Sequence, residues 1–316
     1  MSKPTVSIVL PVFNRLHYLR QTIDAVLAQS FQDWELIIAD DGSSAETLEY
    51  LQDLQRLPQV RLLLLEHSGN VSAVRNCALR AGRGDYFAFL DSDDIWLPSK
   101  LEMQLAALRS RIDCKWSYTG FRLVDAQLEP LPGALRPFPA DGWIVREVLN
   151  ARATVMGSSV VVARQLIESV GLQDESLPWC GDFEMWARIA FNGAAAYVDE
   201  PLVLMRRHAE HSWDDLTCCR DFAEALDRIR DTMGRSDLIP VIRKRRAVAR
   251  ATLARTQARN GQSLSALATL LASARYSWPY GEWWRVAGSA AARAVAPAGV
   301  VGAVRRMRLR PRQQSS

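Results

Sequence analysis

Apolar and polar positions alternate along the first part of the chain in a way that predicts strands and helices in turn. Four short apolar runs, Val6–Val12, Glu35–Ala39, Val60–Leu65 and Tyr86–Leu90, are typical of strands. Between these runs the apolar residues recur three or four positions apart, which is typical of amphipathic helices. The alternation predicts an α/β fold with a mostly parallel, doubly wound sheet and helices on both of its faces.

The middle of the chain continues with shorter elements after a loop. Four prolines and a glycine mark this loop at Pro130–Pro139. Helical spacing follows at Trp143–Leu149 and Arg164–Val170, and a strand is predicted between them at Ser158–Val162. We interpret this part as the second half of the same domain.

From Asp214 onward the pattern is helical almost throughout. Two alanine-rich helices are predicted at Ala247–Ala258 and Ser263–Ala274, joined by a turn at Asn260-Gly261. A single helical hairpin cannot bury its own apolar face, so we expect it to pack on the core or on a neighbour.

Length and composition fit this division. The chain has 316 residues, which is enough for one large domain or two. With 48% hydrophobic and 23% charged residues, it has the composition of a globular protein and not of a disordered or multi-span membrane protein. We therefore predict a domain of residues 1–213, followed by a C-terminal helical extension with a basic tail, residues 214–316.

Several features favour a cytoplasmic protein. The five cysteines are scattered and lack CxxC spacing, which indicates neither a disulfide framework nor a zinc site. The start of the chain has no apolar segment of signal-peptide length. The longest apolar segment, Val286–Val304, is interrupted by Arg293 and Pro297, so we do not expect it to cross a bilayer.

The C-terminal tail is basic, and no acidic residue follows Glu282. Such a tail suits an anionic surface, either membrane or nucleic acid, and equally a solvated tail that aids solubility. We expect no nucleic acid, because aromatic residues do not interleave with the basic ones. Peripheral attachment to an anionic membrane would place Trp283 and Trp284 at the interface. The basic residues of the tail are Arg305, Arg306, Arg308, Arg310 and Arg312.

The residues that follow each predicted strand are candidates for chemistry, because ligands of open α/β sheets bind beyond the carboxyl ends of the strands. The strongest candidate is Asp91-Ser92-Asp93-Asp94, after the fourth strand. Clustered carboxylates repel each other unless a cation lies among them, and Mg²⁺ or Mn²⁺ would also bridge a substrate diphosphate. The alternative is a helix start, where Ser and Asp cap the first turn.

Two further loops leave their function open. Asp40-Asp41-Gly42-Ser43 either presents a carboxylate to a ring N–H of a base or forms a turn with Asx-type hydrogen bonds. Pro11-Val12-Phe13-Asn14 either offers an aromatic ring that stacks on a base or buries a core Phe. No GxGxxG motif follows the first strand, which argues against a dinucleotide-dependent dehydrogenase.

Charged and aromatic residues farther along add candidates. Arg75, on the helix after the third strand, either holds a diphosphate or makes a surface salt bridge. In the tract Trp179–Arg188, carboxylates alternate with tryptophans, which suits sugar binding; helix capping by Asp182 is the alternative. His208 is either a ligand, a phosphate contact or a satisfied surface residue.

Taken in this order and spacing, the segments resemble the family 2 glycosyltransferases, inverting enzymes with the GT-A fold. The resemblance covers residues 4–213 and rests on the ordered occurrence of several segments. They read SIVLPVFNR, LAQSFQDWELIIADDGS, GNVSAVRNCAL, GDYFAFLDSDD, WCGDFEMWARIA and RRHAEHS. One departure is Trp179-Cys180-Gly181, where the family often has an acid before its catalytic base.

The resemblance implies roles for the matching residues. Asp93 would bind the metal, Mg²⁺ or Mn²⁺, in a DxD motif with Asp91, and Asp182 would be the general base. Glu184 and Trp186 would lie on the acceptor side. Contacts with the nucleotide sugar would come from Pro11, Phe13, Asn14, Asp41, Arg75 and Asp91.

The resemblance also implies a reaction. A sugar would move from a nucleoside-diphosphate donor, a UDP- or dTDP-sugar, to a saccharide or lipid-linked acceptor in cell-surface polysaccharide or glycolipid synthesis. Inversion would follow from a single displacement. The competing hypothesis is a protein that keeps the fold and binds nucleotide sugars, or acts as a scaffold, without turnover. The presence of Asp91, Asp93 and Asp182 favours the enzyme.

Overall fold

The computed structural model describes residues 3–131, 139–150, 152–208, 215–233 and 235–295. The chain divides into two compact units, Met1–Ser212 with Asp231–Gly234 and Trp213–Arg230 with Arg235–Ser316. The predicted boundary between residues 213 and 214 lies outside the described residues, as does most of the predicted loop Pro130–Pro139.

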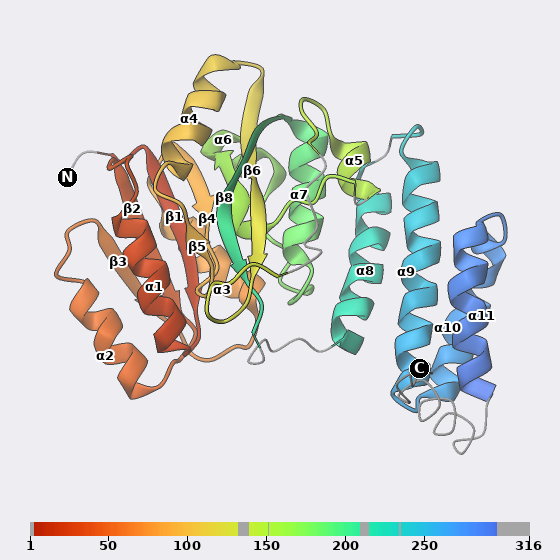
Figure 1. Cartoon of the computed structure of the whole chain (residues 1–316). Coiled ribbons are helices and arrows are strands. Elements are labelled where there is room, and N and C mark those ends of the chain that lie inside the picture. The colour runs from red at the N-terminus through yellow and green to blue at the C-terminus, as the bar shows by residue number, and fades with distance from the viewer. Residues whose placement is uncertain (1–2, 132–138, 151, 209–214, 234, 296–316) are drawn as a thin grey trace, which may run out of the picture. The chain divides into compact units, whose positions relative to one another are not determined.

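The first unit is built on one sheet with the strand order β3-β2-β1-β4-β7-β6-β8-β5. Its first four strands are parallel and lie where the apolar runs predict them (Figure 1). Their carboxyl ends therefore lie along one edge of the sheet. These strands are β1 (Val6–Val12), β2 (Trp34–Asp40), β3 (Val60–Leu64) and β4 (Tyr86–Phe89). The helices that connect them are α1 (Leu16–Leu27), α2 (Ala45–Leu54) and α3 (Val71–Ala81).

The other half of the sheet is mixed. β7 (Val160–Ala163) runs antiparallel to β4 and to β6 (Cys114–Val124). β8 (Ala194–Arg206) is parallel to β6 and antiparallel to the short β5 (Ile95–Trp96). The expected α/β architecture is confirmed, but the parallel arrangement is limited to four of the seven strand pairings.

Four more helices belong to this half: α4 (Lys100–Ser110), α5 (Val145–Leu149), α6 (Arg164–Val170) and α7 (Gly181–Asn192). α6 has the predicted bounds. The helix predicted from Trp143 begins at Val145, and the strand predicted from Ser158 begins at Val160, because Gly157–Ser159 form a short 3₁₀ helix.

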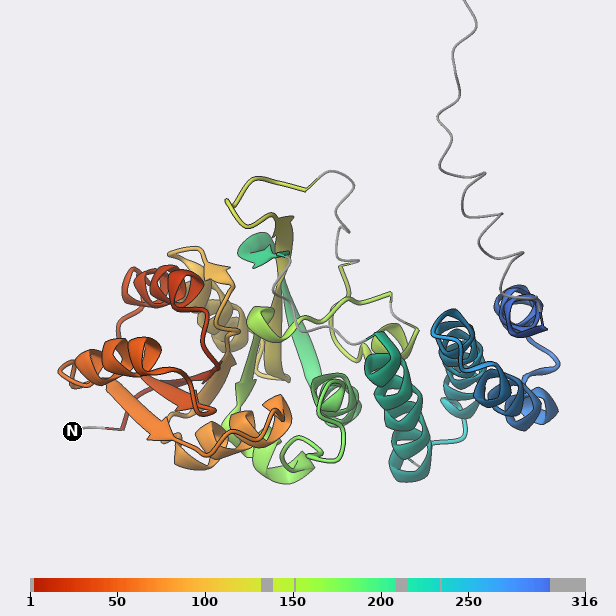
Figure 2. The same cartoon turned by 90° about the horizontal axis from the view of Figure 1, so that it is seen from below.

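Helices cover both faces of the parallel half. α1 and α2 lie on one side of the sheet and α3 on the other (Figure 2). Every residue of β1 and β2 is consequently buried. This burial on both faces explains why these strands read as continuous apolar runs and not as alternating ones.

The second unit is helical. The predicted alanine-rich helices and their turn are confirmed, and Gly261 in the turn has a φ of 77°. The hairpin buries its apolar face against a further helix, in a small core of alanines with Leu270 and Trp283. No helix that the structure describes has the length and apolar composition of a membrane span. The helices are α8 (Asp215–Met233), α9 (Ile239–Arg259), α10 (Ser263–Ser277) and α11 (Gly281–Val295).

A buried carboxylate fastens the parallel strands at the amino end of the sheet. Glu35 in β2 accepts hydrogen bonds from Ser7 Oγ at 2.7 Å and from the Arg83 N–H at 2.6 Å. The Arg83 guanidinium completes the contact, with Nε 2.9 Å from Glu35 Oε2. Burial alone would raise the pKa of Glu35, but these hydrogen bonds and the Arg83 charge outweigh it and lower the pKa.

We expect Glu35→Gln to lower the free energy of unfolding by about 1.5–3 kcal/mol, because the amide cannot satisfy the charged and backbone donors that the carboxylate does. Since the folded pKa is lowered, the stabilisation is complete above the unfolded value of ~4.3 and is lost as pH falls through the folded value. Urea denaturation of both proteins at pH 7 and in acid measures the difference. The exposed Glu49 on α2 supplies the control, Glu49→Gln, and equal losses in the two variants would contradict the prediction.

Candidate functional site

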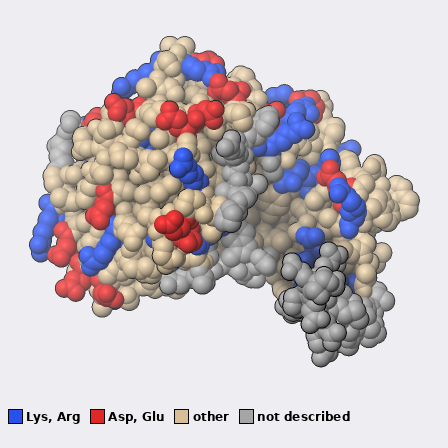
Figure 3. Space-filling view, viewed as in Figure 1, with Lys and Arg blue, Asp and Glu red and all other residues tan. Residues whose placement is uncertain are grey.

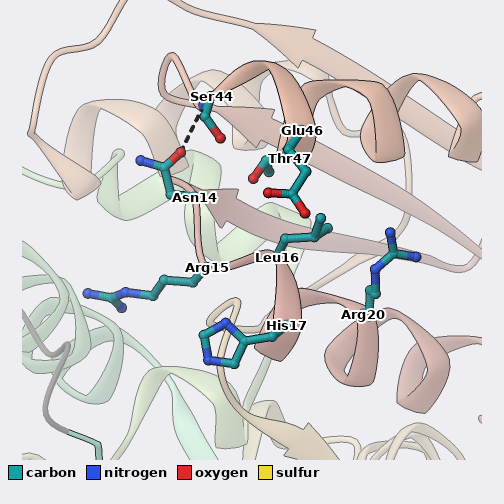
Figure 4. Close-up of a pocket in the computed structure, with 8 residues that line it drawn as sticks. All are labelled: Asn14, Arg15, Leu16, His17, Arg20, Ser44, Glu46 and Thr47. Atoms are coloured by element: carbon teal, nitrogen blue, oxygen red, sulfur yellow. Dashed lines mark hydrogen bonds between the residues drawn. The ribbon is translucent and has the colours of Figure 1, made fainter.

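A tight turn joins the end of β1 to α1. Asn14 and Arg15 both have a φ of 58°, in the left-handed region that residues other than glycine rarely adopt. Two hydrogen bonds hold the turn, from the Asn14 N–H to Ser43 Oγ at 2.7 Å and from the Ser44 N–H to Asn14 Oδ1 at 2.8 Å (Figure 4). Asn14 thus ties the ends of β1 and β2 together. Pro11, expected at the nucleotide sugar, is buried within β1.

A cavity of about 580 Å³ opens beside this turn, between the beginnings of α1 and α2. Its lining includes His17, Arg20 and Glu46 (Figure 4). The Arg15 side chain points away from Glu46, and its Nη1 lies 3.2 Å from Asp93 Oδ2. Arg15 therefore connects the turn after β1 with the acidic loop after β4.

Phe13, Asp41 and His67 gather where β1, β2 and β3 end. The rings of Phe13 and His67 stack with their centroids 4.2 Å apart and 17° between their planes. Phe13 is 43% exposed, so the alternative of a buried core residue is wrong. The loops therefore offer an accessible aromatic surface next to a carboxylate.

The Asp41 carboxylate holds the loop that follows β3. Its Oδ1 accepts from the N–H and the Oγ of Ser68, each at 2.8 Å, and its Oδ2 accepts from the Gly69 N–H at 3.0 Å. Gly42 beside it has a φ of 77°, and a Cβ there would come within 3.0 Å of His67 Cβ. The expected Asx-type turn is formed by Asp40, whose Oδ2 accepts from the Ser43 N–H at 3.1 Å. Asp41 instead orders the loop after β3 and borders the aromatic surface.

Arg75 on α3 is the cation around which the carboxylates are arranged. Its guanidinium donates to Asp91 Oδ1, and its side chain is 8% exposed, so the surface salt bridge considered for it is wrong. Burial alone would lower the pKa of Arg75, but the charges of Asp91, Asp182 and Asp93 outweigh burial and raise it. The site therefore contains a permanently charged guanidinium among three acids.

The acidic loop after β4 directs Asp93 toward Arg15 and His208. Besides Arg15, its Oδ2 lies 3.0 Å from His208 Nε2. His208 follows β8, its side chain is 1% exposed, and its ring centroid is 4.5 Å from that of Tyr18 in α1. His208 is thus a buried member of the site and not a surface residue.

Asp94 turns into the protein. Its Oδ2 accepts from Ser158 Oγ at 2.5 Å and its Oδ1 from the Arg206 N–H at 3.0 Å. Burial raises the pKa of Asp94, and the neighbouring charges of Asp93 and Asp91 raise it further. Of the loop's three carboxylates, Asp91 is the most open, with 37% of its side chain exposed. The alternative that this segment starts a helix and caps its first turn is therefore wrong, because its acids contact residues far away along the chain.

Asp182 is the second residue of α7 and is half-buried. Burial raises the pKa of Asp182, while the Arg75 charge and the hydrogen bond from the Phe183 N–H, at 2.6 Å from Oδ1, oppose that shift. The structure brings this carboxylate into the electrostatic reach of Arg75 and Asp91, although more than a hundred residues separate it from Arg75 along the chain.

Glu184 and Trp186 lie differently from the expectation. Glu184 is 4% exposed and both of its oxygens accept from Arg188, one turn later on α7, at 2.6–2.9 Å. Trp186 is 2% exposed and meets Phe89 edge to face at 4.9 Å. Neither side chain is open to an acceptor in this structure, because the first is neutralised inside the fold and the second is part of the core.

The donor chemistry at Asp93 fits the expected cation. No group of three or more His, Cys, Asp or Glu side chains forms a metal cluster within the described part of the chain. Asp93 and His208 nevertheless place an oxygen and a nitrogen donor 3.0 Å apart, and the open Asp91 carboxylate belongs to the same loop. Carboxylates suit Mg²⁺ and Mn²⁺, which complete their coordination with water and phosphate oxygens.

Residues 7–115 match the family model described as glycosyl transferase family 2. This match and the similarity to known glycosyltransferases support a family 2 glycosyltransferase. The matched segment runs from β1 to the start of β6 and includes Asp41, Arg75, Asp91 and Asp93. Asp182 and His208 lie beyond the matched segment, and their geometry connects them with it.

Relatives support the same family. An uncharacterized glycosyltransferase of Rickettsia prowazekii is 32% identical over 215 residues, which are 65% of this chain and 65% of the relative. The Escherichia coli protein WfgD, a UDP-Glc:alpha-D-GlcNAc-diphosphoundecaprenol beta-1,3-glucosyltransferase, is 39% identical over 107 residues, 33% of this chain and 40% of WfgD. The aligned segment thus spans between two fifths and two thirds of these two relatives.

Solved structures share the fold. TarS 1-349 of S. aureus in complex with UDP-GlcNAc has a TM-score of 0.62 at 17% identity, over 92% of this chain and 81% of TarS 1-349. The mannosyltransferase PcManGT from Pyrobaculum calidifontis, in complex with GDP-Man and Mn²⁺, has a TM-score of 0.57 at 16% identity, over 97% of this chain and 88% of that protein. The chain is an α/β protein of the GT-A fold with an appended helical region.

We expect Asp41→Ala to loosen the loop after β3, because the N–H groups of Ser68 and Gly69 lose a charged acceptor that contributes about 1.5–3 kcal/mol. Amide hydrogen exchange in the peptide that covers residues 66–70 should accelerate about ten-fold or more. The control is Asp53→Ala on α2, whose carboxylate is 59% exposed and pairs with Arg56 at the surface. Unchanged exchange at residues 66–70 would show that Asp41 does not hold this loop.

Proposed function

We propose that this chain moves a sugar, with inversion, from a nucleoside-diphosphate donor to a saccharide or lipid-linked acceptor. The observation that supports the proposal most is the position of Arg75 among Asp91, Asp93 and Asp182, at the edge where the parallel strands end. A diphosphate needs fixed cations and an acceptor hydroxyl needs a carboxylate that takes its proton. Both kinds of group meet at this edge.

In the proposed reaction, the acceptor hydroxyl oxygen bonds to the anomeric carbon of the sugar. The bond between that carbon and the donor phosphate oxygen breaks, and its electron pair leaves with the nucleoside diphosphate. The hydroxyl proton passes to a carboxylate oxygen of Asp182. Because burial raises the pKa of Asp182, it is a stronger base than an exposed aspartate, and the single displacement inverts the anomeric centre.

The nucleotide side of the proposal uses the loops after β1, β2 and β3. The stacked rings of Phe13 and His67 offer a flat surface for a base, and Asp41 borders it with a carboxylate for a ring N–H. A UDP-sugar, or a dTDP-sugar with the same ring N–H, suits these groups. The UDP-GlcNAc complex of TarS and the UDP-glucose donor named for WfgD are consistent with this choice.

We further propose that Asp93, with His208 as a nitrogen donor, holds a Mg²⁺ or Mn²⁺ ion. When bound, this ion supplies positive charge for the leaving diphosphate. Arg15 and Arg75 lie beside the same carboxylates and add the chain's own positive charge. The acceptor named for WfgD is a saccharide on diphosphoundecaprenol. We therefore propose to test a lipid-linked acceptor at the inner face of a membrane first.

The proposed activity is tested by incubating the full chain with single UDP-, dTDP- and GDP-sugars and Mn²⁺, and by measuring release of the nucleoside diphosphate. We expect release from a UDP- or dTDP-sugar, and faster release with a diphosphoundecaprenol-linked saccharide. Tight binding of a donor in calorimetry without release under any condition would instead favour a nucleotide-sugar-binding protein without turnover.

We expect chelation to abolish turnover and Asp93→Ala to remove the response to Mn²⁺, because this carboxylate is the proposed oxygen ligand of the ion beside His208. Calorimetric titration with Mn²⁺ in the presence of UDP gives the affinity directly. Asp85→Ala is the matched control, since Asp85 lies just before the start of β4 and its side chain is 61% exposed. An Asp93→Ala protein that keeps near-normal activity without added metal would refute the assignment.

For Asp182→Asn we expect a rate loss of about 10²- to 10⁴-fold with donor affinity nearly unchanged, because the amide keeps the shape but cannot take a proton. Since the pKa of Asp182 is raised, the rate of the parent should fall with decreasing pH along a limb above ~3.9, the ordinary value for aspartate, and this limb should vanish in the variant. Asp199→Asn, at an exposed position in β8, is the control. Transfer at the parental rate by Asp182→Asn would exclude Asp182 as the base.

A further inference from the structure

The second unit carries a line of exposed apolar side chains that its own core does not use. Leu264, Leu271 and Trp278 are 84%, 75% and 68% exposed. They are seven residues apart, which places them on one side of α10 and at its end. The opposite side of α10 is occupied, because Ala266 and Leu270 pack in the core with α9 and α11.

A tryptophan of α11 extends this surface. Trp284 is 44% exposed, its ring meets that of Trp278 edge to face at 4.7 Å, and its Nε1 donates to the Trp278 carbonyl at 3.1 Å. Trp283 beside it is only 4% exposed and belongs to the core, so the interfacial position expected for Trp283 is wrong. We call Leu264, Leu271, Trp278 and Trp284 the apolar face.

The charges around the apolar face are almost entirely positive. Ten Lys and Arg residues but one acid, Glu282, occur in the described helices α9, α10 and α11. Glu282 is neutralised by Lys244, 2.8 Å away. Arg275 and Arg285, on the same two helices as the face, are exposed. Blue also predominates over red around α9 to α11 in Figure 3.

We propose that the apolar face binds the surface of a bilayer that contains anionic lipid. Leucine side chains gain by leaving water for the boundary of the acyl chains, and tryptophans favour the interface, where the ring is apolar and the N–H is polar. Arg275 and Arg285 would meet lipid phosphates at the same depth, and basic residues close to an anionic surface strengthen binding.

The charges of the second unit argue against two other partners for the apolar face, a second copy of the chain and nucleic acid. A second copy on this face would bring two strongly positive units together, which is unfavourable. Nucleic acid would neutralise the arginines but would leave the leucines in water. The inference uses only the second unit and does not depend on the proposed transfer reaction.

The test is co-sedimentation of the full chain with vesicles of phosphatidylcholine, with and without phosphatidylglycerol. We expect binding to the anionic vesicles, and at least a ten-fold lower partition coefficient for the triple variant Leu264→Ser, Leu271→Ser, Trp278→Ser. The replaced side chains are exposed, so circular dichroism should show an unchanged helix content. Arg275→Glu with Arg285→Glu should weaken binding to anionic vesicles and leave the weak binding to neutral ones unchanged.

The control is Ile112→Ser in the first unit, where Ile112 is 89% exposed. All variants keep the terminal arginines at positions 305 to 312, which lie outside the described residues. Unchanged vesicle binding by the triple variant would assign attachment to another part of the chain and overturn the proposal. So would a dimer of the parent that the triple variant converts to a monomer while vesicle binding stays the same.

Discussion

The ion pair between Arg75 and the surrounding carboxylates is the interaction on which the rest of the site depends. Asp91 and Asp93 come from the loop after β4 and Asp182 from the start of α7, and each contributes to the field that keeps the Arg75 guanidinium charged. Without that cation, three acids at one edge would repel each other, and removing one member of a buried charge network typically costs several kcal/mol. The cation that holds these segments together is also the one proposed to bind the diphosphate, so in this proposal one residue serves both packing and chemistry.

Behind this ion pair lies a layer of buried polar contacts that fixes the loop from the rear. Trp96 Nε1 donates to the Ser158 carbonyl at 2.7 Å, and Lys100 Nζ lies 4.0 Å from the centroid of the Trp96 ring. Lys100 is fully buried, and burial lowers its pKa well below the ordinary value. Together with the contacts of Asp94 with Ser158 and Arg206, these groups hold the acidic loop from inside the fold. Asp91 and Asp93 can therefore face the candidate site while Asp94 stays in the interior.

The sequence predicts the parallel half of the sheet well, because strands buried on both faces leave continuous apolar runs. β6 and β8 escape prediction, since β6 buries Ser117 and Thr119 beside its aromatics and β8 carries Pro201 within its span. Residues directly after the predicted strands, such as Phe13 and Asp41, are found because the topology fixes where the strands end. His208 is a candidate from the sequence, but its contact with Asp93, 115 residues away, leaves no local pattern that would decide its role. Arg15 is not identified, because a backbone of unusual φ leaves no such pattern either. The structural role of Glu184 did have a signal, the arginine four positions later.

The left-handed turn at Asn14 and Arg15 also limits which sequences can occupy this position. Each such conformation costs of order 1–3 kcal/mol for a residue with a Cβ, and glycine would remove that cost. Glycine would equally remove the amide that binds Ser44 and the guanidinium that reaches Asp93. In a library randomised at positions 14 and 15, selection for stability would favour glycine, which adopts this backbone conformation without cost. Selection for the contacts with Ser44 and Asp93 would favour the present residues. Variants enriched for thermal stability and variants enriched for metal or donor binding should diverge first at these two positions.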